Sequence, residues 1–412
     1  MPRALTLAVL AICVSVRSGA TGRSNNDATL EQLYDQHRWF ELRDTIAGGT
    51  VAPFYVGAVA SAFNQVASAE AFLNRAVREA RTPDDANKAR EALAILYMQH
   101  SRSRDMLRIL DDMLTAAPTR ADVRNMRDGF ERFRRIPNQV VHLGRRTPFV
   151  CAVTASGVTL PARVNGKPVE WLFDSGFSHA SVSEGEARTL GIPVHGVSMT
   201  AGDFSATTQT QTGVAERIVI GDSELRNVPV MIFPDSHPMW SDRPPGRRGI
   251  LGLPVAVALG GIGWTKSGTC QLGADPTGRV AIADANMAFD GESPPVTRVR
   301  FEGRMLDFTL DTGAQDGTQL WQRFAADFPQ VIARGSKSTT EVQQIGGRRE
   351  EEIVAIPDLR LRVGGFDALL PRARVFLNRE GTGMQYGNLG MDVFSQAPEV
   401  TFDFRRMSIA FR

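Results

Sequence analysis

The chain has 412 residues, more than one ordinary domain holds, so two or three domains are expected. Its composition, 42% hydrophobic and 22% charged residues, is that of a globular protein able to bury substantial cores. The 47 basic and 45 acidic residues leave a formal net charge of +2, which argues against nucleic acid as a partner held by a large basic field.

The N-terminus has the order of residues found in a secretory signal. Arg3 is followed by a mostly apolar run at 4–16 and then by the small residues Ser18-Gly19-Ala20. We therefore predict a signal peptide at 1–22 and an exported protein, periplasmic or extracellular; an uncleaved anchor or a misread start codon is the alternative. The run has 13 residues, fewer than the roughly 20 that a membrane span needs, so the mature chain is expected to lack a stable span.

Two cysteines remain after such a signal is removed, Cys151 and Cys270. An exported protein can join two cysteines in a disulfide, but two separate buried thiols fit the sequence equally well. The six histidines are scattered, and neither Cys-x-x-Cys nor His-Glu-x-x-His occurs. The sequence therefore predicts no metal site and no cofactor.

Residues 26–136 show helical periodicity. Apolar residues recur at helical spacing in 67–81, 89–97 and 106–114, and Pro83 suits the first turn of a helix. We predict an all-α domain of helical hairpins that loosely resembles tetratricopeptide-type repeats, with a plain bundle as the alternative. Its role is either to dock a protein partner or substrate, or to cap the rest of the chain structurally.

From residue 140 the pattern changes to short β-strands. Residues 158–164 alternate between apolar and polar, Asn165-Gly166 is a hairpin turn, and 169–173 reads as a strand. The β region divides into two comparable halves, which we place at 145–290 and 295–412.

Each half contains the same landmark, an apolar strand that ends in a short triplet. The triplets are Asp-Ser-Gly at 174–176 and Asp-Thr-Gly at 311–313. In each half an apolar step later ends in glycine, Gly252 or Gly390, at separations of 252 − 174 = 78 and 390 − 311 = 79 residues. A duplicated half-domain explains this agreement most simply.

These triplets and glycines resemble those of the aspartic peptidases, and the compact halves are similar to the retropepsin-like group. The resemblance covers about residues 145–412. It implies an all-β bilobal acid-protease fold made of two fused retropepsin-like halves, preceded by the helical domain.

The resemblance assigns Asp174 and Asp311 as the catalytic pair of an aspartic endopeptidase acting on proteins or peptides. Two close carboxyl groups cannot both ionise cheaply, so they share a proton; one activates a water as general base and the other protonates the scissile amide. The resemblance also implies six supporting residues: Ser175, Gly176, Gly252, Thr312, Gly313 and Gly390. The two hydroxyl residues would bond across the interface, and the glycines would leave room for close approach.

One position departs from the family pattern. Phe177 follows the first triplet, where the family has a small residue, whereas the second has Ala314. Phe177 would fill a pocket, narrow it, or mark a half that has drifted from catalysis. The alternative function is accordingly a non-catalytic peptide-binding protein with a helical docking domain. Neither position carries the extra hydroxyl of pepsin-like enzymes, so we expect a dyad that works nearer neutral pH.

Three further segments are assigned from local pattern. Two polar hairpins, at Gly202-Asp203 and at Gly346-Gly347, are candidate flaps over a substrate. The Pro- and Arg-rich stretch at 240–248 reads as a surface loop. His179 is expected in a pocket wall or at the surface, because the mechanism has no role for it.

Overall fold

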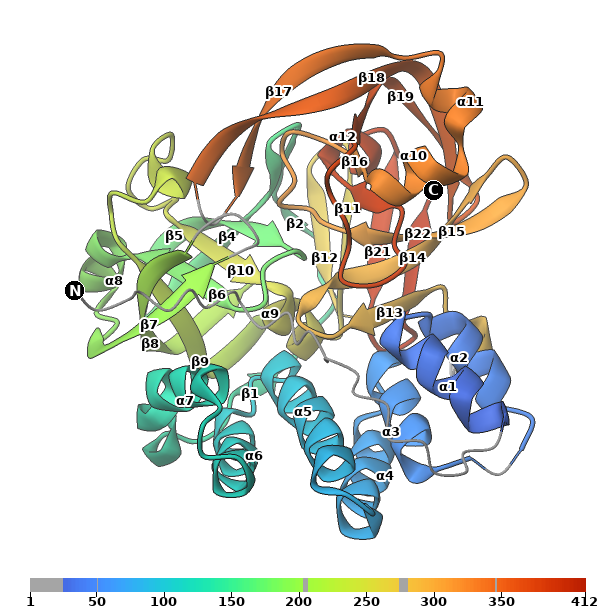
Figure 1. The fold of residues 1–412 in the computed structure, drawn as a ribbon. Coiled ribbons are helices and arrows are strands. Elements are labelled where there is room, and N and C mark those ends of the chain that lie inside the picture. The colour runs from blue at the N-terminus through green and yellow to red at the C-terminus, as the bar shows by residue number, and fades with distance from the viewer. Residues whose placement is uncertain (1–24, 50, 203–206, 274–280, 345–346) are drawn as a thin grey trace, which may run out of the picture.

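The computed structural model describes residues 25–49, 51–202, 207–273, 281–344 and 347–412. Its helices precede a much larger β-rich region and lie along one side of it (Figure 1). The expected order, a helical region followed by a β region, is confirmed. The predicted signal peptide at 1–22 lies outside the described residues. Within those residues no helix is both long and apolar enough to cross a membrane.

Short punctuated helices build the N-terminal region. Its helices are α1 Asn25–Asp35, α2 Trp39–Ile46, α3 Pro53–Ala62, α4 Val66–Glu79, α5 Pro83–Gln99, α6 Ser103–Ala116 and α7 Ala121–Phe130, with the 3-10 helix η1 Glu131–Arg135. From α3 to α7, each helix packs against the next. The crossing of α3 and α4 is close, because a Cβ on Gly57 would lie 2.7 Å from Leu73 Cγ. The likeness to tetratricopeptide repeats stays a prediction.

The first half forms a nine-stranded sheet within the described residues. Its strands are β1 Val140–His142, β3 Ala152–Thr154, β4 Gly157–Val164, β5 Lys167–Asp174, β6 Ala180–Ser183, β7 His195–Gly202, β8 Thr207–Ile220, β9 Ser223–Phe233 and β10 Gly249–Gly252. The accompanying helices are α8 Glu184–Leu190, η2 Pro238–Trp240 and α9 Leu253–Leu259.

The second half forms an eight-stranded sheet, again counted over the part of the chain described. Its strands are β13 Met287–Asp290, β14 Ser293–Phe301, β15 Arg304–Leu310, β16 Gln319–Leu320, β17 Ser336–Gln344, β18 Gly347–Val363, β19 Phe366–Phe376 and β20 Gly387–Leu389. The helices of this half are α10 Gln322–Asp327, α11 Pro329–Ile332 and α12 Met391–Phe394, and η3 Ile282–Asp284 precedes it.

The two sheets have the same strand pairing. β5 pairs in parallel with β10 as β15 does with β20, and β6 pairs in parallel with β9 as β16 does with β19. The antiparallel pairs β4–β5 and β14–β15, and β7–β8 and β17–β18, correspond likewise. The two halves therefore share these strand pairings, which agrees with the duplication inferred from the sequence.

A third, five-stranded sheet joins the halves. It runs in the order β2 Phe149–Val150, β12 Thr269–Leu272, β11 Gly261–Thr265, β21 Glu399–Asp403 and β22 Ser408–Phe411. β11 of the first half pairs with β21 of the second, and Trp264 stacks on Phe402 with ring centroids 5.8 Å apart.

Each half closes with an apolar segment, at 263–272 and at 400–411. Each segment is a hairpin. The turns have clear causes: Gly268 adopts a φ of 89°, and the Asp403 carboxylate accepts hydrogen bonds from the backbone amides of Arg405 and Arg406.

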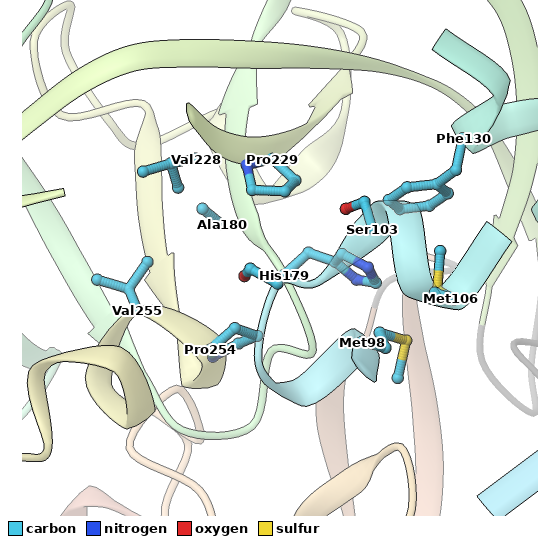
Figure 2. A pocket seen from close by; sticks show the side chains of 11 residues that line it. Met98, Ser103, Met106, Phe130, His179, Ala180, Val228, Pro229, Pro254 and Val255 are labelled. Carbon is cyan, nitrogen blue, oxygen red and sulfur yellow. The ribbon is translucent and has the colours of Figure 1, made fainter. Parts of the chain in front are cut away.

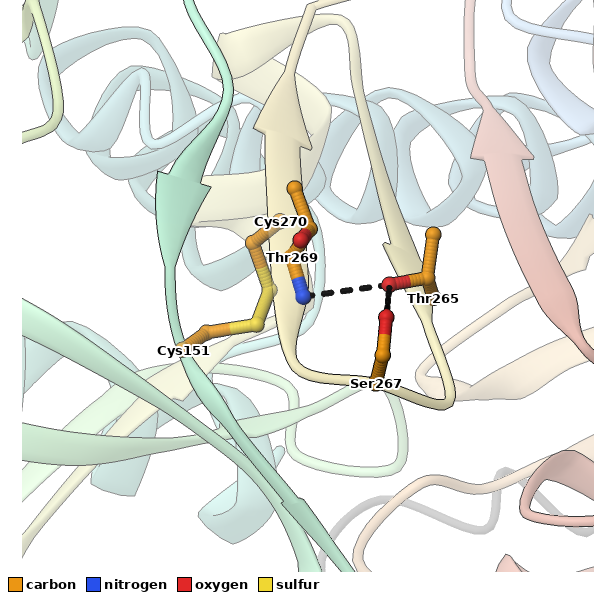
Figure 3. The surroundings of a disulfide bond; sticks show 5 residues. All are labelled: Cys151, Thr265, Ser267, Thr269 and Cys270. Atoms are coloured by element: carbon orange, nitrogen blue, oxygen red, sulfur yellow. Dashed lines mark hydrogen bonds between the residues drawn. A yellow bond between two sulfur atoms is a disulfide. The ribbon is translucent and has the colours of Figure 1, made fainter.

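Cys151 and Cys270 form a disulfide, which resolves the alternative left open by the sequence. The bridge links the segment after β2 to β12, as Figure 3 shows beside the Thr265–Ser267 turn. Its two cysteines are 119 residues apart in the sequence, so the bridge restricts the unfolded chain strongly. In the folded protein it ties the start of the first half to β12 of the joint sheet.

Asp290, at the end of β13, connects the helical region to the second half. Its buried carboxylate accepts hydrogen bonds from Trp39 Nε1 and His37 Nδ1, each at 2.6 Å. From the second half, Gln385 Nε2 donates at 2.6 Å and Thr382 Oγ1 at 3.2 Å. Burial opposes the charged form of His37, but the charge and hydrogen bond of Asp290 outweigh it and raise the pKa of His37.

We expect Asp290→Ala to destabilise the protein by about 3–5 kcal/mol, the usual cost of leaving buried donors without their charged partner. Urea unfolding of the full chain measures the change. Asp367→Ala, which removes an exposed carboxylate from β19, is the matched control and should shift stability by less than about 0.5 kcal/mol. Equal stability of the two variants would contradict the linking role of Asp290.

Candidate active site

The two triplets lie at equivalent points of the duplicated sheets. Asp174 ends β5, where its register partner on the parallel strand β10 is Gly252. Asp311 directly follows β15, and its backbone amide donates to the Leu389 carbonyl of β20 at 3.0 Å. Each carboxylate therefore emerges where a buried strand ends beside a strand that finishes in glycine.

The hydroxyl residues hold the triplets together across the interface. Thr312 Oγ1 accepts from the Ser175 amide at 3.0 Å and donates to the Phe173 carbonyl at 3.0 Å. Reciprocally, Ser175 Oγ accepts from the Thr312 amide at 3.0 Å and donates to the Leu310 carbonyl at 2.8 Å. Ser175 is 1% exposed and Thr312 is 0% exposed, so these bonds are shielded from water.

Glycine is required at four positions around the triplets. A Cβ on Gly176 would collide with the Asp311 carboxylate, and one on Gly313 with that of Asp174. The two carboxyl groups therefore each lie against the opposite triplet and face each other.

The later glycines support the same loops. A Cβ on Gly252 would lie 2.7 Å from the Phe177 carbonyl oxygen, and one on Gly390 would lie 2.8 Å from that of Ala314. Each glycine thus lies directly against the loop that follows a triplet.

Burial and mutual repulsion shift both acids. Burial first, and then the charge of Asp311, raise the pKa of Asp174 to about 8. Burial also raises the pKa of Asp311, but hydrogen bonds from Asn388, the Gly313 amide and Asp174 oppose the rise. The pair titrates as a unit in which Asp174 is the favoured site of the proton.

Asn388 makes the two acids unequal, and sequence reasoning missed it. Its Nδ2 donates to Asp311 Oδ2 at 2.9 Å, while Thr309 Oγ1 donates to Asn388 Oδ1 at 2.6 Å and fixes the amide. The equivalent residue of the first half is Ile250, which has no polar group. Comparison of Asn388-Leu389-Gly390 with Ile250-Leu251-Gly252 was the signal that could have revealed this difference.

A large cleft opens at the acids, with a volume of about 1540 Å³. Asp174 and Asp311 line it, together with the loop before β10, the loop before β20, and residues of α3 and α5. The helical region is therefore one wall of the cleft.

The stretch at 240–248 is a largely exposed loop, as its composition predicted, but its first residue is an exception. Trp240 is fully buried, and Arg243 lies across its ring with the guanidinium 5.9 Å from the centroid. Arg243 lines the cleft and lies near enough to Asp174 to oppose the rise of the Asp174 pKa. The buried ring of Trp240 therefore anchors an otherwise exposed loop at the cleft.

The flap hairpins differ between the halves. Gly202 ends β7 opposite Thr207, and Gly347 begins β18 opposite Gln344; Asp203 and Gly346 lie outside the described residues. The β7–β8 hairpin is attached to α7. Its Thr212 Oγ1 donates to the Gly129 carbonyl at 2.8 Å. The β17–β18 hairpin extends from the second half as one long ribbon (Figure 1).

Phe177 packs against Phe233, with ring centroids 6.0 Å apart, and also borders the cleft. Its presence leaves the triplet intact, since the hydrogen bonds of Ser175 mirror those of Thr312.

His179 points away from the acids into a small cavity between the helical region and the first half. There it lies near Phe130, Ser103 and Met98 (Figure 2). Desolvation lowers its pKa to about 4, so the ring is neutral and serves as a pocket wall. No group of histidines, cysteines and acids suited to a metal ion occurs among the described residues.

Part of the first half matches a known protein family. Residues 160–255 match a family model described as aspartyl protease, so this segment, which includes Asp174 and Gly252, has the pattern of that family. Among solved structures, a retropepsin-like aspartic protease from Rickettsia conorii aligns with 33% of this chain and 94% of its own, at 15% identity and a TM-score of 0.24. The search of curated proteins gave no significant match.

Ser175→Ala should destabilise the protein by about 2–3 kcal/mol, because it leaves the buried Thr312 amide without an acceptor and the Leu310 carbonyl without that donor. Thr312→Ser keeps the second hydroxyl and is the matched control. Chemical unfolding of both full-length variants tests the bridge; a Ser175→Ala protein as stable as Thr312→Ser would show that the bridge contributes nothing.

Proposed function

We propose that the protein is an aspartic endopeptidase that hydrolyses peptide bonds in proteins or peptides. The observation that carries this proposal is the pair of facing carboxyl groups at the cleft. Each accepts from a backbone amide of its own triplet, but only Asp311 also receives a side-chain amide donor, from Asn388. The unequal surroundings divide the roles: Asp311 is the ionised general base and Asp174 the protonated general acid.

In this mechanism a water between the acids gives its proton to Asp311 as its oxygen attacks the peptide carbonyl carbon. Asp174 gives its proton to the carbonyl oxygen, which forms a neutral tetrahedral intermediate. Collapse of this intermediate breaks the C–N bond, and the departing nitrogen takes the proton held by Asp311. A proton from the intermediate's hydroxyl returns to Asp174, so both acids regain their starting states.

The long β17–β18 hairpin is the proposed flap. It extends from the second half as one long ribbon, and β18 reaches η2 of the first half (Figure 1). The β7–β8 hairpin, in contrast, is hydrogen-bonded to α7 through Gly129 and Asn125. Closure would therefore come from the β17–β18 hairpin alone, while the β7–β8 hairpin stays attached to α7.

The proposed setting is an exported compartment, periplasmic or extracellular. The disulfide between Cys151 and Cys270 supports it, because such bridges persist under oxidising conditions. The helical region is proposed to contact the substrate protein, since α3 and α5 line the cleft.

Asp174→Asn and Asp311→Asn should each lower peptide cleavage by about 10²- to 10⁴-fold, because each removes one partner of the proton transfer. Cleavage of a diverse peptide mixture between about pH 3 and pH 8 measures the loss. Asp367→Asn, far from the triplets in sequence and exposed on β19, is the control. Activity that survives either dyad substitution sinks the assignment, and peptide binding without cleavage by the parent would favour a binding protein.

The pH profile should be shifted toward neutrality. Activity requires ionised Asp311 and protonated Asp174, so it rises as pH passes the raised pKa of Asp311 and falls as pH passes that of Asp174, about 8. Asn388→Ala removes a donor that favours ionised Asp311 and should move the acidic limb up by about 1 pH unit.

The basic limb, set by Asp174, should stay in place and serves as the internal control. The rate measured against pH in parent and variant tests the division of roles. An optimum below about pH 4, or equal movement of both limbs, contradicts it.

A further inference from the structure

The turn between β13 and β14 brings a residue of the second half to the first triplet. Gly291 and Glu292 in this turn border a narrow cavity together with Ser175 and Gly176. The equivalent β3–β4 turn of the first half lies beside the other triplet, since a Cβ on Gly157 would be 3.7 Å from the Thr312 carbonyl oxygen. Each triplet is thus flanked by a turn from the opposite half.

The two turns differ in charge. The β13–β14 turn reads Gly291-Glu292, whereas the β3–β4 turn reads Ala155-Ser156. Ser156 and Glu292 both line the cleft. The duplicated fold therefore presents a carboxylate on one side of the dyad and a neutral hydroxyl on the other.

Glu292 has no partner within the described part of the chain: no donor or cation there meets its carboxylate, and burial alone raises its pKa to about 7. Gln99, the last residue of α5, lies beside it. Gln99 Nε2 donates to the Gly291 carbonyl at 2.7 Å, but its buried Oε1 receives no hydrogen bond. Two acceptors that lack donors therefore border the cleft together.

Three basic side chains that line the cleft form ion pairs with acids other than Glu292. Arg247 pairs with Glu170, Lys88 with Glu31, and Arg379 with Glu351. Arg243 interacts with Asp174, and it does not enter the pKa of Glu292, which burial alone raises. The protein thus supplies none of these side chains to neutralise Glu292.

We propose that Glu292 and Gln99 form a subsite for a positively charged group of the substrate, an ammonium or guanidinium, next to Gly176. Such a group carries only donors, which complements two unsatisfied acceptors. The charge comes from a Lys or Arg side chain near the scissile bond or from the α-amino group of a short substrate. The inference deepens the proposed peptidase function, and it gives the helical region a direct contact with substrate through Gln99.

The test uses full-length protein and peptides with one common cleavable core. Each position near the scissile bond is varied among Lys, Arg, norleucine and Glu, and a second set compares free with acetylated N-termini. Glu292→Gln removes the charge, and Glu292→Lys reverses it. The matched control is Glu302→Gln, which neutralises an exposed glutamate in the turn after β14, at the opposite end of that strand from Glu292.

The parent should cleave the cationic peptide with a kcat/KM about tenfold or more above that of the norleucine peptide at one position. Glu292→Gln should reduce this ratio to within about twofold, Glu292→Lys should favour the Glu peptide, and Glu302→Gln should keep the parental ratio. A preference confined to free N-termini identifies the α-amino group as the source of the charge.

Fluorescence anisotropy measures binding of the same peptides to the Asp311→Asn protein. This binding measurement separates the subsite proposal from the peptidase proposal. Cleavage by the parent without charge preference overturns the subsite and leaves the peptidase function intact. A charge preference in binding that Glu292→Gln removes, with no cleavage by the parent, supports the subsite and overturns the peptidase function. An unchanged preference in Glu292→Gln and Glu292→Lys overturns the subsite in either case.

Discussion

The reciprocal bonding of Ser175 and Thr312 is the constraint on which the arrangement of the site depends. Each hydroxyl accepts from the backbone amide of the other and donates to the carbonyl before the opposite aspartate. Neither residue can be satisfied inside its own half, since both are buried and their partners lie across the interface. The carboxylates therefore face each other because the backbones that carry them are tied together, in spite of the repulsion between two buried acids.

Within this symmetric frame, individual side chains break the symmetry. Asn388 takes the place of the apolar Ile250 and favours charge on Asp311, while the charge of Arg243 opposes the rise of the Asp174 pKa. A duplicated fold supplies equal positions, but two acids in equal surroundings have no preferred site for a shared proton. One amide is enough to choose between them, because a hydrogen bond to a charged group in a buried site is worth about 1.5–3 kcal/mol.

The site residues that could be predicted from the sequence are those at which the backbone geometry allows few residue types. The triplets and their distant glycines were readable because no other residue fits where Gly313 meets the Asp174 carboxylate. Helices such as α4 and strands such as β5 were readable from their periodicity.

What remained hidden depends on contacts between segments far apart in the chain. The partner of Asn388 and the burial of Trp240 arise only when loops of the fold meet, and no local pattern encodes them. The pairing of Cys151 with Cys270 is of the same kind, because it requires β2 to lie beside β12.

The joint sheet has a consequence for how the protein is made. The edge of β11 away from β12 finds its partner in β21, about 140 positions later in the chain, so the joint sheet cannot complete its hydrogen bonding while the first half emerges during synthesis. Until residues 399–403 are synthesised, the β21 edge of β11 stays unpaired. The two triplets therefore acquire their fixed arrangement only late in synthesis.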